Sequence, residues 1–279
     1  MAFPTETVYG LGANALDVAA IDKIYAAKGR PPSSPLIVHV SSIEMARGLV
    51  REWPERAERL ARKFWPGPLT LVLPKQPHVP DRLTAGLDTV GVRMPANPIA
   101  EALIREAGVP IAAPSANLFT QLSPTTAQHV RDSLGDRVAM VLDGGRTTVG
   151  IESTVLSLAG SAAVLLRPGM VTKAEIEAVI GPVQMLGSVA DGAHASPGLH
   201  ARHYSPKTPL ILVERGELPS TGRGFCLQMP ANPREYAAVL YERLRQADAQ
   251  GWDWIAIEQP PPGDEWSAIR DRLERAASR

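Results

Sequence analysis

The hydrophobic positions of this chain change period repeatedly between residues 16 and 182. Short β-branched runs with strand spacing alternate there with segments whose apolar residues recur every three or four positions, the pattern of an α/β domain. The runs that predict strands are residues 36–40, 69–73, 90–94, 110–113, 138–143, 153–158 and 163–167. We therefore expect a sheet with flanking helices over this part of the chain.

Local signals predict where several of the helices begin. A hydroxyl or carboxylate side chain just before a helical segment can accept hydrogen bonds from its first backbone N–H groups, and a Glu three positions later completes a capping box. Proline suits the first helical position. The predicted starts are Asp17, Ser41 with Glu44, Ser123 with Pro124, and Thr172 with Glu175.

The pattern breaks at residues 186–208, which are rich in Gly, Ala, Ser, Pro and His and show no period. This composition is typical of a linker. Beyond it, strand-like runs at 210–214, 224–229 and 252–259 surround amphipathic segments at 233–251 and 265–278. We expect a first α/β domain over residues 1–185, a linker over 186–208 and a second, smaller α/β domain over 209–279.

Composition narrows the classes of protein that this chain can belong to. Lys plus Arg and Asp plus Glu are equal at 29 each, so no global basic field attracts nucleic acid or an anionic membrane. Cys226 is the single cysteine, which excludes an internal disulfide and a multi-Cys metal site. No apolar run approaches the roughly 20 residues of a membrane span. These features predict a cytoplasmic protein with small ligands.

The glycines of "FPTETVYGLGANA", residues 3–15, first suggest a dinucleotide site. Gly10, Gly12 and Ala15 match the loose form of the G-x-G-x-x-A fingerprint. That fingerprint needs an acidic residue roughly 20 positions further on to hold a ribose hydroxyl. The chain has no carboxylate between Asp22 and Glu44, so the match is weak.

Two polar segments are better candidates for chemistry. Lys28 and Arg30 flank a glycine in "KGRPPSSPL", where they either offset the dipole of the preceding helix or grip an anionic ligand. Ser115 and Asn117 follow the strand run at 110–113, and α/β sheets bind ligands at the carboxyl ends of strands. An ordinary hydroxyl or Asx turn is the alternative for this second segment.

Taken in order, "FPTETVYGLG", Lys28-x-Arg30, Ser115-x-Asn117, "GIESTV" and "LLRPGMVT" resemble the threonylcarbamoyl-AMP synthase family. The later "SPGLHARHYSPKTPL", residues 196–210, is similar to the linker of its two-domain members. The resemblance implies a YrdC-like twisted mixed sheet with flanking helices, followed by a linker and a small Rossmann-like domain. It covers nearly the whole chain.

The resemblance also implies an activity. Members of this family are nucleotidyltransferases that condense L-threonine, bicarbonate and ATP into threonylcarbamoyl-AMP and pyrophosphate, with Mg²⁺ bound through the ATP phosphates. A separate complex then transfers the threonylcarbamoyl group to tRNA. Such an enzyme need not hold tRNA itself, which agrees with the neutral chain.

Carried over position by position, the resemblance implies specific site residues. The implied catalytic residues are Lys28, Arg30, Ser115 and Asn117. The implied threonine-binding residues are Thr7, His39, Arg93, Ala113 and Ser153, with Arg93 meeting the substrate carboxylate. The implied nucleotide-binding residues are Arg30, Ser34, Thr89, Ser115, Ser123, Arg167 and Tyr204. No dedicated metal cage is evident, and Mg²⁺ commonly keeps few protein ligands.

The linker holds side chains that are unusual for a passive spacer. We expect it to close over the ATP site as a lid, with Tyr204 on the nucleotide and Arg202 and His203 near its phosphates. An inert connector made rigid by its prolines is the alternative.

Three departures from the family pattern leave other functions open. Family members usually carry a helix and the beginning of a strand ahead of "FPTETVYG", and glycine near Thr120, where a non-glycine residue costs energy if φ is positive. The second domain also looks shortened between residues 217 and 222. A threonine- and ATP-binding protein with impaired turnover, and an RNA-binding module, are therefore the alternatives.

Overall fold

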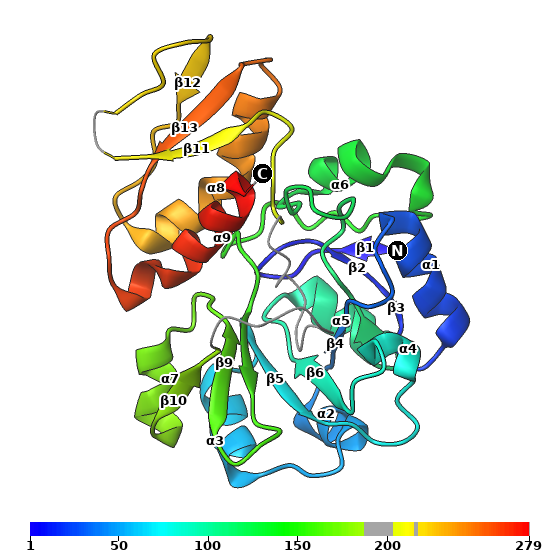
Figure 1. Cartoon of the computed structure of the whole chain (residues 1–279). Helices are drawn as coiled ribbons and strands as arrows, with labels where there is room; N and C mark the ends of the chain where they lie inside the picture. Colours follow the sequence, from blue (N-terminus) through cyan, green and yellow to red (C-terminus); the bar gives the residue numbers. More distant parts are fainter. Residues whose placement is uncertain (187–202, 215–216, 279) are drawn as a thin grey trace.

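The main body of the molecule is an eight-stranded mixed sheet (Figure 1). The computed structural model describes residues 1–186, 203–214 and 217–278. The strand order is β10-β9-β8-β5-β6-β4-β7-β3, with parallel neighbours at β10–β9, β8–β5 and β6–β4. The strands are β3 (Ala13–Asn14), β4 (Ile37–His39), β5 (Leu69–Pro74), β6 (Thr89–Arg93), β7 (Ile111–Ala112), β8 (Thr154–Ser157), β9 (Ala163–Arg167) and β10 (Val183–Met185). A separate antiparallel pair, β1 (Ala2–Phe3) and β2 (Gly10–Leu11), opens the chain.

Helices pack against this sheet and bury its apolar side chains. They are α1 (Val18–Lys28), α2 (Ile43–Leu49), α3 (Glu55–Phe64), α4 (Asp81–Thr84), α5 (Pro98–Ala107), α6 (Ala127–Leu134) and α7 (Lys173–Ile180), with a short 3₁₀ turn, η1 (Gly135–Arg137). Ile21 of α1 and Leu60 of α3 belong to the same buried cluster as Leu71 of β5.

Strand periodicity separates the core from the polar positions. Val38 and Val92 enter the main helix-covered core. Because successive side chains on a strand point to opposite faces, Ile37, His39 and Arg93 lie on the other face. β4 and β6 run parallel with His39 opposite Arg93, so two ionisable side chains stand side by side at the carboxyl ends of both strands.

The C-terminal part, coloured from yellow to red in Figure 1, is a smaller Rossmann-like α/β unit that lies beside the main sheet. Its parallel strands are ordered β11-β13-β12. Its elements are β11 (Leu210–Val213), β12 (Gly224–Cys226), α8 (Pro233–Asp248), β13 (Trp254–Glu258), η2 (Asp264–Trp266) and α9 (Ser267–Ala277). Val8, Leu122 and Ile151 of the first domain share one hydrophobic cluster with Tyr241 and Leu244 of α8.

Most locally specified boundaries are confirmed. The Asp17 carboxylate accepts from the backbone N–H groups of Ala19 and Ala20, and α1 ends at Gly29 with φ +60°. Thr172 and Glu175 form the expected capping box of α7. All the strand runs except 138–143 contain an observed strand.

Three local predictions are wrong, each because a tertiary contact or a neighbouring residue prevails. Ser42, not Ser41, caps α2. Ser123 does not begin a helix, because its hydroxyl donates to Glu152 while Thr126 caps α6. Residues 138–143 form a single parallel bridge, from Val141 to Ala2, because their partner β1 is only two residues long.

The expected strain near Thr120 is present. Thr120 has φ +69°, in the left-handed region that costs a β-branched residue energy. Its carbonyl accepts from Ser205 N–H at 2.9 Å, so the strained residue connects the first domain to the end of the linker.

Candidate active site

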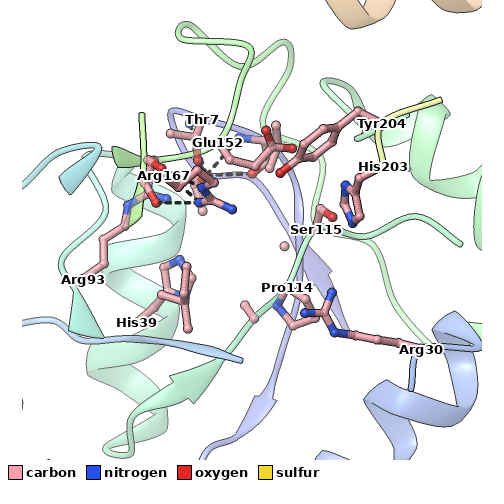
Figure 2. Close-up of a pocket in the computed structure, with 16 residues that line it drawn as sticks. Thr7, Arg30, His39, Arg93, Pro114, Ser115, Glu152, Arg167, His203 and Tyr204 are labelled. Atoms are coloured by element: carbon pink, nitrogen blue, oxygen red, sulfur yellow. Dashed lines mark hydrogen bonds between the residues drawn. The ribbon is translucent and has the colours of Figure 1, made fainter. Parts of the chain in front are cut away.

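A pocket of about 540 Å³, continuous with solvent, opens on the polar face of the main sheet. Figure 2 shows His39 and Arg93 on one side of an open centre and Arg30, Ser115, His203 and Tyr204 on the other. The lining residues are Thr5, Thr7, Val8, Gly10, Arg30, Ile37, His39, Arg93, Ala113, Pro114, Ser115, Glu152, Ser153, Arg167, His203 and Tyr204.

The structure brings most of the candidate residues together, although they are spread over 198 positions of sequence. Those that line the pocket are Thr7, Arg30, His39, Arg93, Ala113, Ser115, Ser153, Arg167 and Tyr204. Those that do not line it are Lys28, Ser34, Thr89, Asn117 and Ser123. The binding roles of all these residues stay predictions.

His39 supplies a neutral ring to the pocket. Burial, followed by the neighbouring Arg93 cation, lowers the pKa of His39 to about 3. Its ring lies edge-on to Phe3, with centroids 6.2 Å apart. Among the described residues its Nδ1 has no hydrogen-bond partner, so this nitrogen is available to a ligand.

Arg93 already has an acidic neighbour. Its Nη2 lies 2.6 Å from Glu6 Oε1, and both side chains are almost fully buried. The Nε atom of Arg93 donates to Gly67 O at 3.2 Å. Within the described part of the chain the Glu6 carboxylate accepts no aligned hydrogen bond. A substrate carboxylate would therefore meet a guanidinium that is already paired with Glu6. Nothing in the sequence indicated this pairing.

Hydroxyl groups line the wall between β5 and the amino-terminal loop. Thr7 Oγ1 lies 2.8 Å from Thr5 Oγ1, and Ser153 Oγ lies 2.8 Å from Thr70 Oγ1. The guanidinium of Arg167 donates to the Ser153 carbonyl at 3.0 Å and to its hydroxyl at 3.2 Å. These contacts fix the hydroxyls in place.

Arg30 forms the opposite wall without an acidic partner among the described residues. Its guanidinium donates to the hydroxyl and carbonyl of Ser34 and to Pro35 O, and lies over the Phe119 ring. Burial lowers the pKa of Arg30 to about 10, which leaves it a cation at neutral pH. Ser34 thus orients Arg30 from behind the pocket.

Lys28 and Asn117 shape the loop that carries Ser115. The Lys28 ammonium donates to the carbonyls of Ser115 at 2.5 Å and Asn117 at 2.6 Å. The Asn117 amide donates to Leu118 O and Gln121 O. Both side chains are buried, and their hydrogen bonds fix the backbone of this loop, which borders the pocket.

Thr89 lies on the same face of β6 as Arg93, four residues away. Two side-chain repeats of a strand span about 13 Å. Thr89 accordingly lines a neighbouring cavity together with Ile37 and Val155.

Glu152 lines the pocket and was not among the candidates. Its Oε1 accepts from Ser123 at 2.5 Å, and its Oε2 accepts from Tyr241 at 3.0 Å and Arg272 at 2.8 Å. Burial raises the pKa of Glu152, but the Arg272 and Arg167 cations and the Ser123 hydrogen bond outweigh burial and leave it lowered. The signal available in sequence was a lone carboxylate just before an apolar strand run, in "GIESTV".

His203 and Tyr204 close the pocket from the linker. Tyr204 is 1% exposed with φ +59°, and its ring contacts the His203 ring with centroids 4.1 Å apart. Arg202, the other cation expected in the lid, lies outside the described residues.

No metal cage is found within the described residues, where no cluster of three or more His, Cys, Asp or Glu side chains occurs. Glu152, the carboxylate that lines the pocket, already accepts from three side chains. The search of the described helices likewise finds none long and apolar enough to cross a membrane.

Two family models match the chain. The Sua5/YciO/YrdC model, described as "Telomere recombination", matches residues 1–169, and the model of the threonylcarbamoyl-AMP synthase C-terminal domain matches residues 171–278. The chain belongs to the threonylcarbamoyl-AMP synthase family, in its two-domain form.

Individual relatives agree with this assignment. Threonylcarbamoyl-AMP synthase of Bacillus subtilis is 45% identical, over 99% of this chain and 89% of the relative. The crystal structure of Pyrococcus abyssi Sua5 complexed with L-threonine is 42% identical with a TM-score of 0.92, over 99% of this chain and 89% of that one. A variant of the same Sua5 with alanine at a histidine and the following tyrosine has a TM-score of 0.90 and 41% identity, over 99% and 88%.

Proposed function

We propose that this protein is an L-threonylcarbamoyladenylate synthase, a nucleotidyltransferase that uses L-threonine, bicarbonate and ATP, and that the pocket is its active site. The observation that carries the proposal is Arg30, a buried guanidinium without an acidic partner among the described residues. Burying an uncompensated cation is costly, and the phosphates of ATP would offset that cost.

The opposite side of the pocket suits threonine. The hydroxyls of Thr7 and Ser153, the neutral His39 ring and the Arg93 guanidinium all line it there, and Glu6 pairs with Arg93 from outside the lining. Such a set suits threonine, because the cation can meet its carboxylate, and the hydroxyls and the imidazole can accept from its amine. The methyl group of Ala113 adds apolar surface for the substrate side chain.

The chemistry has two steps. The threonine amine attacks the carbon of bicarbonate, and water leaves, which yields a carbamate. A carbamate oxygen then attacks the α-phosphorus of ATP, the bond to the β-phosphate oxygen breaks, and pyrophosphate leaves. Positioning and charge neutralisation dominate such transfers, and Arg30, Arg167 and Ser115, which line the pocket, would do that work.

The pocket suits Mg²⁺ as an ion carried on the ATP phosphates, since Glu152, the carboxylate in its lining, already accepts from three side chains. A bound Mg²⁺ would screen phosphate charge. We place the reaction in the cytoplasm, with a separate complex transferring the threonylcarbamoyl group to tRNA. The neutral chain agrees with an enzyme that does not hold tRNA itself.

Mass spectrometry of the purified chain with all three substrates tests this proposal. We expect threonylcarbamoyl-AMP, with one pyrophosphate released per product, and no product when any substrate is omitted. Binding of threonine and ATP without product would instead favour a binding protein. A salt-sensitive tRNA mobility shift without product would favour an RNA-binding module.

We further propose that the segment around Tyr204 acts as the lid of the nucleotide site. Tyr204 lines the pocket, and the following Ser205 is bridged to Gln121. A closed lid would exclude water and protect the product anhydride from hydrolysis.

We expect Tyr204→Ala to raise KM for ATP about tenfold or more and to change KM for threonine little, because the ring borders the part of the pocket beside Ser115 and Arg30. Steady-state kinetics with each substrate varied in turn measures the effect. Tyr236→Ala, which removes a buried tyrosine inside the C-terminal domain, is the control. Equal changes in both KM values would contradict a lid over ATP.

Cutting the chain after residue 189 would be an unclear test of the lid. It would also uncover Val8, Leu122 and Ile151, which pack against the C-terminal domain, and would destabilise the first domain for that reason alone.

A further inference from the structure

A buried salt bridge joins the C-terminal domain to the wall of the pocket. Arg272 of α9 is fully buried. Its Nε donates to Glu152 Oε2 at 2.8 Å, across 120 positions of sequence, and its Nη2 donates to Pro168 O at 3.1 Å. Asp271 pairs with its Nη1 at 2.5 Å. The guanidinium therefore donates to protein partners and does not contact a substrate.

α8 supplies a second contact to the same carboxylate. Tyr241 donates its hydroxyl to Glu152 Oε2 at 3.0 Å, and its ring stacks on Tyr204 with centroids 5.9 Å apart. The Arg272 guanidinium also lies 5.1 Å from the centre of the Tyr204 ring. Both C-terminal helices thus contact Glu152 and Tyr204, and both of these line the pocket.

The approach of α8 is unusually close. Gly150 has φ +83°, and a Cβ built there would lie 2.3 Å from Ala237 O of α8. The segment that leads into Glu152 is therefore pressed against backbone of the second domain, so the position of Glu152 depends on how that domain is seated.

We propose that Arg272 is a positioning residue for the reaction: from the C-terminal domain it holds the Glu152 carboxylate oriented and ionised beside the substrates. This inference rests on the proposed function, since it concerns the same pocket. A carboxylate whose two oxygens are both occupied cannot rotate, and its fixed negative charge in turn orients Arg167, with which it interacts.

The charges around Glu152 give the proposal a measurable signature. The charged and titratable groups that face it are Lys28 of α1, Arg167 of β9, Tyr204, Tyr241 of α8, and Arg272 of α9 with Asp271 behind it. Among the causes that lower the pKa of Glu152, the Arg272 cation is the largest. Without that cation, burial is opposed mainly by the Arg167 cation and the Ser123 hydrogen bond, so the pKa of Glu152 would rise and the carboxyl group would take up a proton at a higher pH.

The main test is Arg272→Met, which removes the charge and retains side-chain packing against the Tyr204 ring. We expect kcat/KM for ATP to fall about a hundredfold near neutral pH, the loss that a misplaced group typically causes. We also expect the acid limb of the pH–rate profile to move to higher pH. Arg270→Met is the matched control, because Arg270 lies on the same helix and, among the described residues, donates only to the carbonyls of Pro261 and Gly263; it should leave rate and profile unchanged.

A double-mutant cycle shows whether Arg272 acts through Glu152. In a Glu152→Gln background, Arg272→Met should lower kcat/KM by no more than about twofold further, because its target is already neutral. The proposal would be overturned if the losses of kcat/KM from the two substitutions multiplied in the double mutant, or if Arg272→Met kept the pH–rate profile of the native chain. A purely structural arginine would lower the melting temperature without moving the acid limb.

Tyr241→Phe decides the question if Arg272→Met does not fold. It removes one hydroxyl and preserves the ring, so folding should be little affected. We expect a several-fold loss of kcat/KM for ATP and an acid limb shifted to higher pH, as in Arg272→Met. An unchanged pH–rate profile would overturn the proposal. Product formation by the native chain tests the proposed function. The role of Arg272 is tested by a different quantity, the ratio of the variant rate to the native rate.

Discussion

Arg30→Ala should lower kcat/KM for threonylcarbamoyl-AMP formation about a hundredfold while leaving the free energy of unfolding almost unchanged. Loss of one charge-assisted contact in a water-poor site costs about 3 kcal/mol of transition-state stabilisation, near a hundredfold in rate. Among the described residues, the folded protein loses the hydrogen bonds to Ser34 and Pro35 and the contact with the Phe119 ring, and it is relieved of a buried cation without an acidic partner. A buried catalytic cation of this kind lowers the free energy of unfolding of the protein.

Single-turnover kinetics and urea unfolding measure the two quantities in parallel. Arg105→Ala is the control, since Arg105 is an exposed arginine paired with Glu101 on α5 and should change neither. Native kinetics in Arg30→Ala would remove Arg30 from the site. A large fall in both rate and stability would show that Arg30 is structural, and the assignment of the phosphate side of the pocket would then lose its main support.

Gly150→Ala should destabilise the protein by about 3 kcal/mol or more. The new Cβ would lie 2.3 Å from Ala237 O and 2.5 Å from Ala238 Cα, both backbone atoms of α8 that cannot move without the helix. Overpacking costs about 1–3 kcal/mol, and the left-handed backbone adds about 1–2 kcal/mol for a residue with a Cβ. Because Glu152 follows two positions later, activity should fall as well.

Gly160→Ala is the matched control for this substitution. Gly160 has no positive φ and a Cβ there would meet nothing within 4 Å, so its replacement should be close to neutral. Denaturant unfolding of the two variants and the native chain gives the comparison. Equal stability of Gly150→Ala and Gly160→Ala would mean that the two domains do not pack as closely in solution as they do here.

These experiments bear on why the second domain is present. Its core includes Val8, Leu122 and Ile151 of the first domain, and its helices reach the pocket through Tyr241 and Arg272. Ion pairing between Arg146 and Glu242 adds a further link. The C-terminal domain is therefore built into the environment of the site even though none of its described residues lines the pocket.

Local sequence was enough to predict much of the architecture. The start of α1 at Asp17, its end at Gly29 and the capping box at Thr172 depend on hydrogen bonds within a few residues, and such bonds can be recognised in any sequence that contains the side chains. Strand alternation likewise accounts for His39 and Arg93 lying on the face away from Val38 and Val92, although this was not predicted from the sequence. The quoted motifs then indicated the family.

Only the folded chain shows which of the motif residues meet and what they are paired with. Ser123 looked like a helix start but bonds to Glu152, and Arg93 looked free for a substrate but lies beside Glu6. Thr89 shares a face of β6 with Arg93 but lines a neighbouring cavity. Arg272 gave no signal at all, because its partner is 120 positions away. Caps and strand alternation arise from interactions between near neighbours in sequence, whereas a buried charge is positioned by whichever distant side chain compensates it, and that pairing exists only once the two domains have packed.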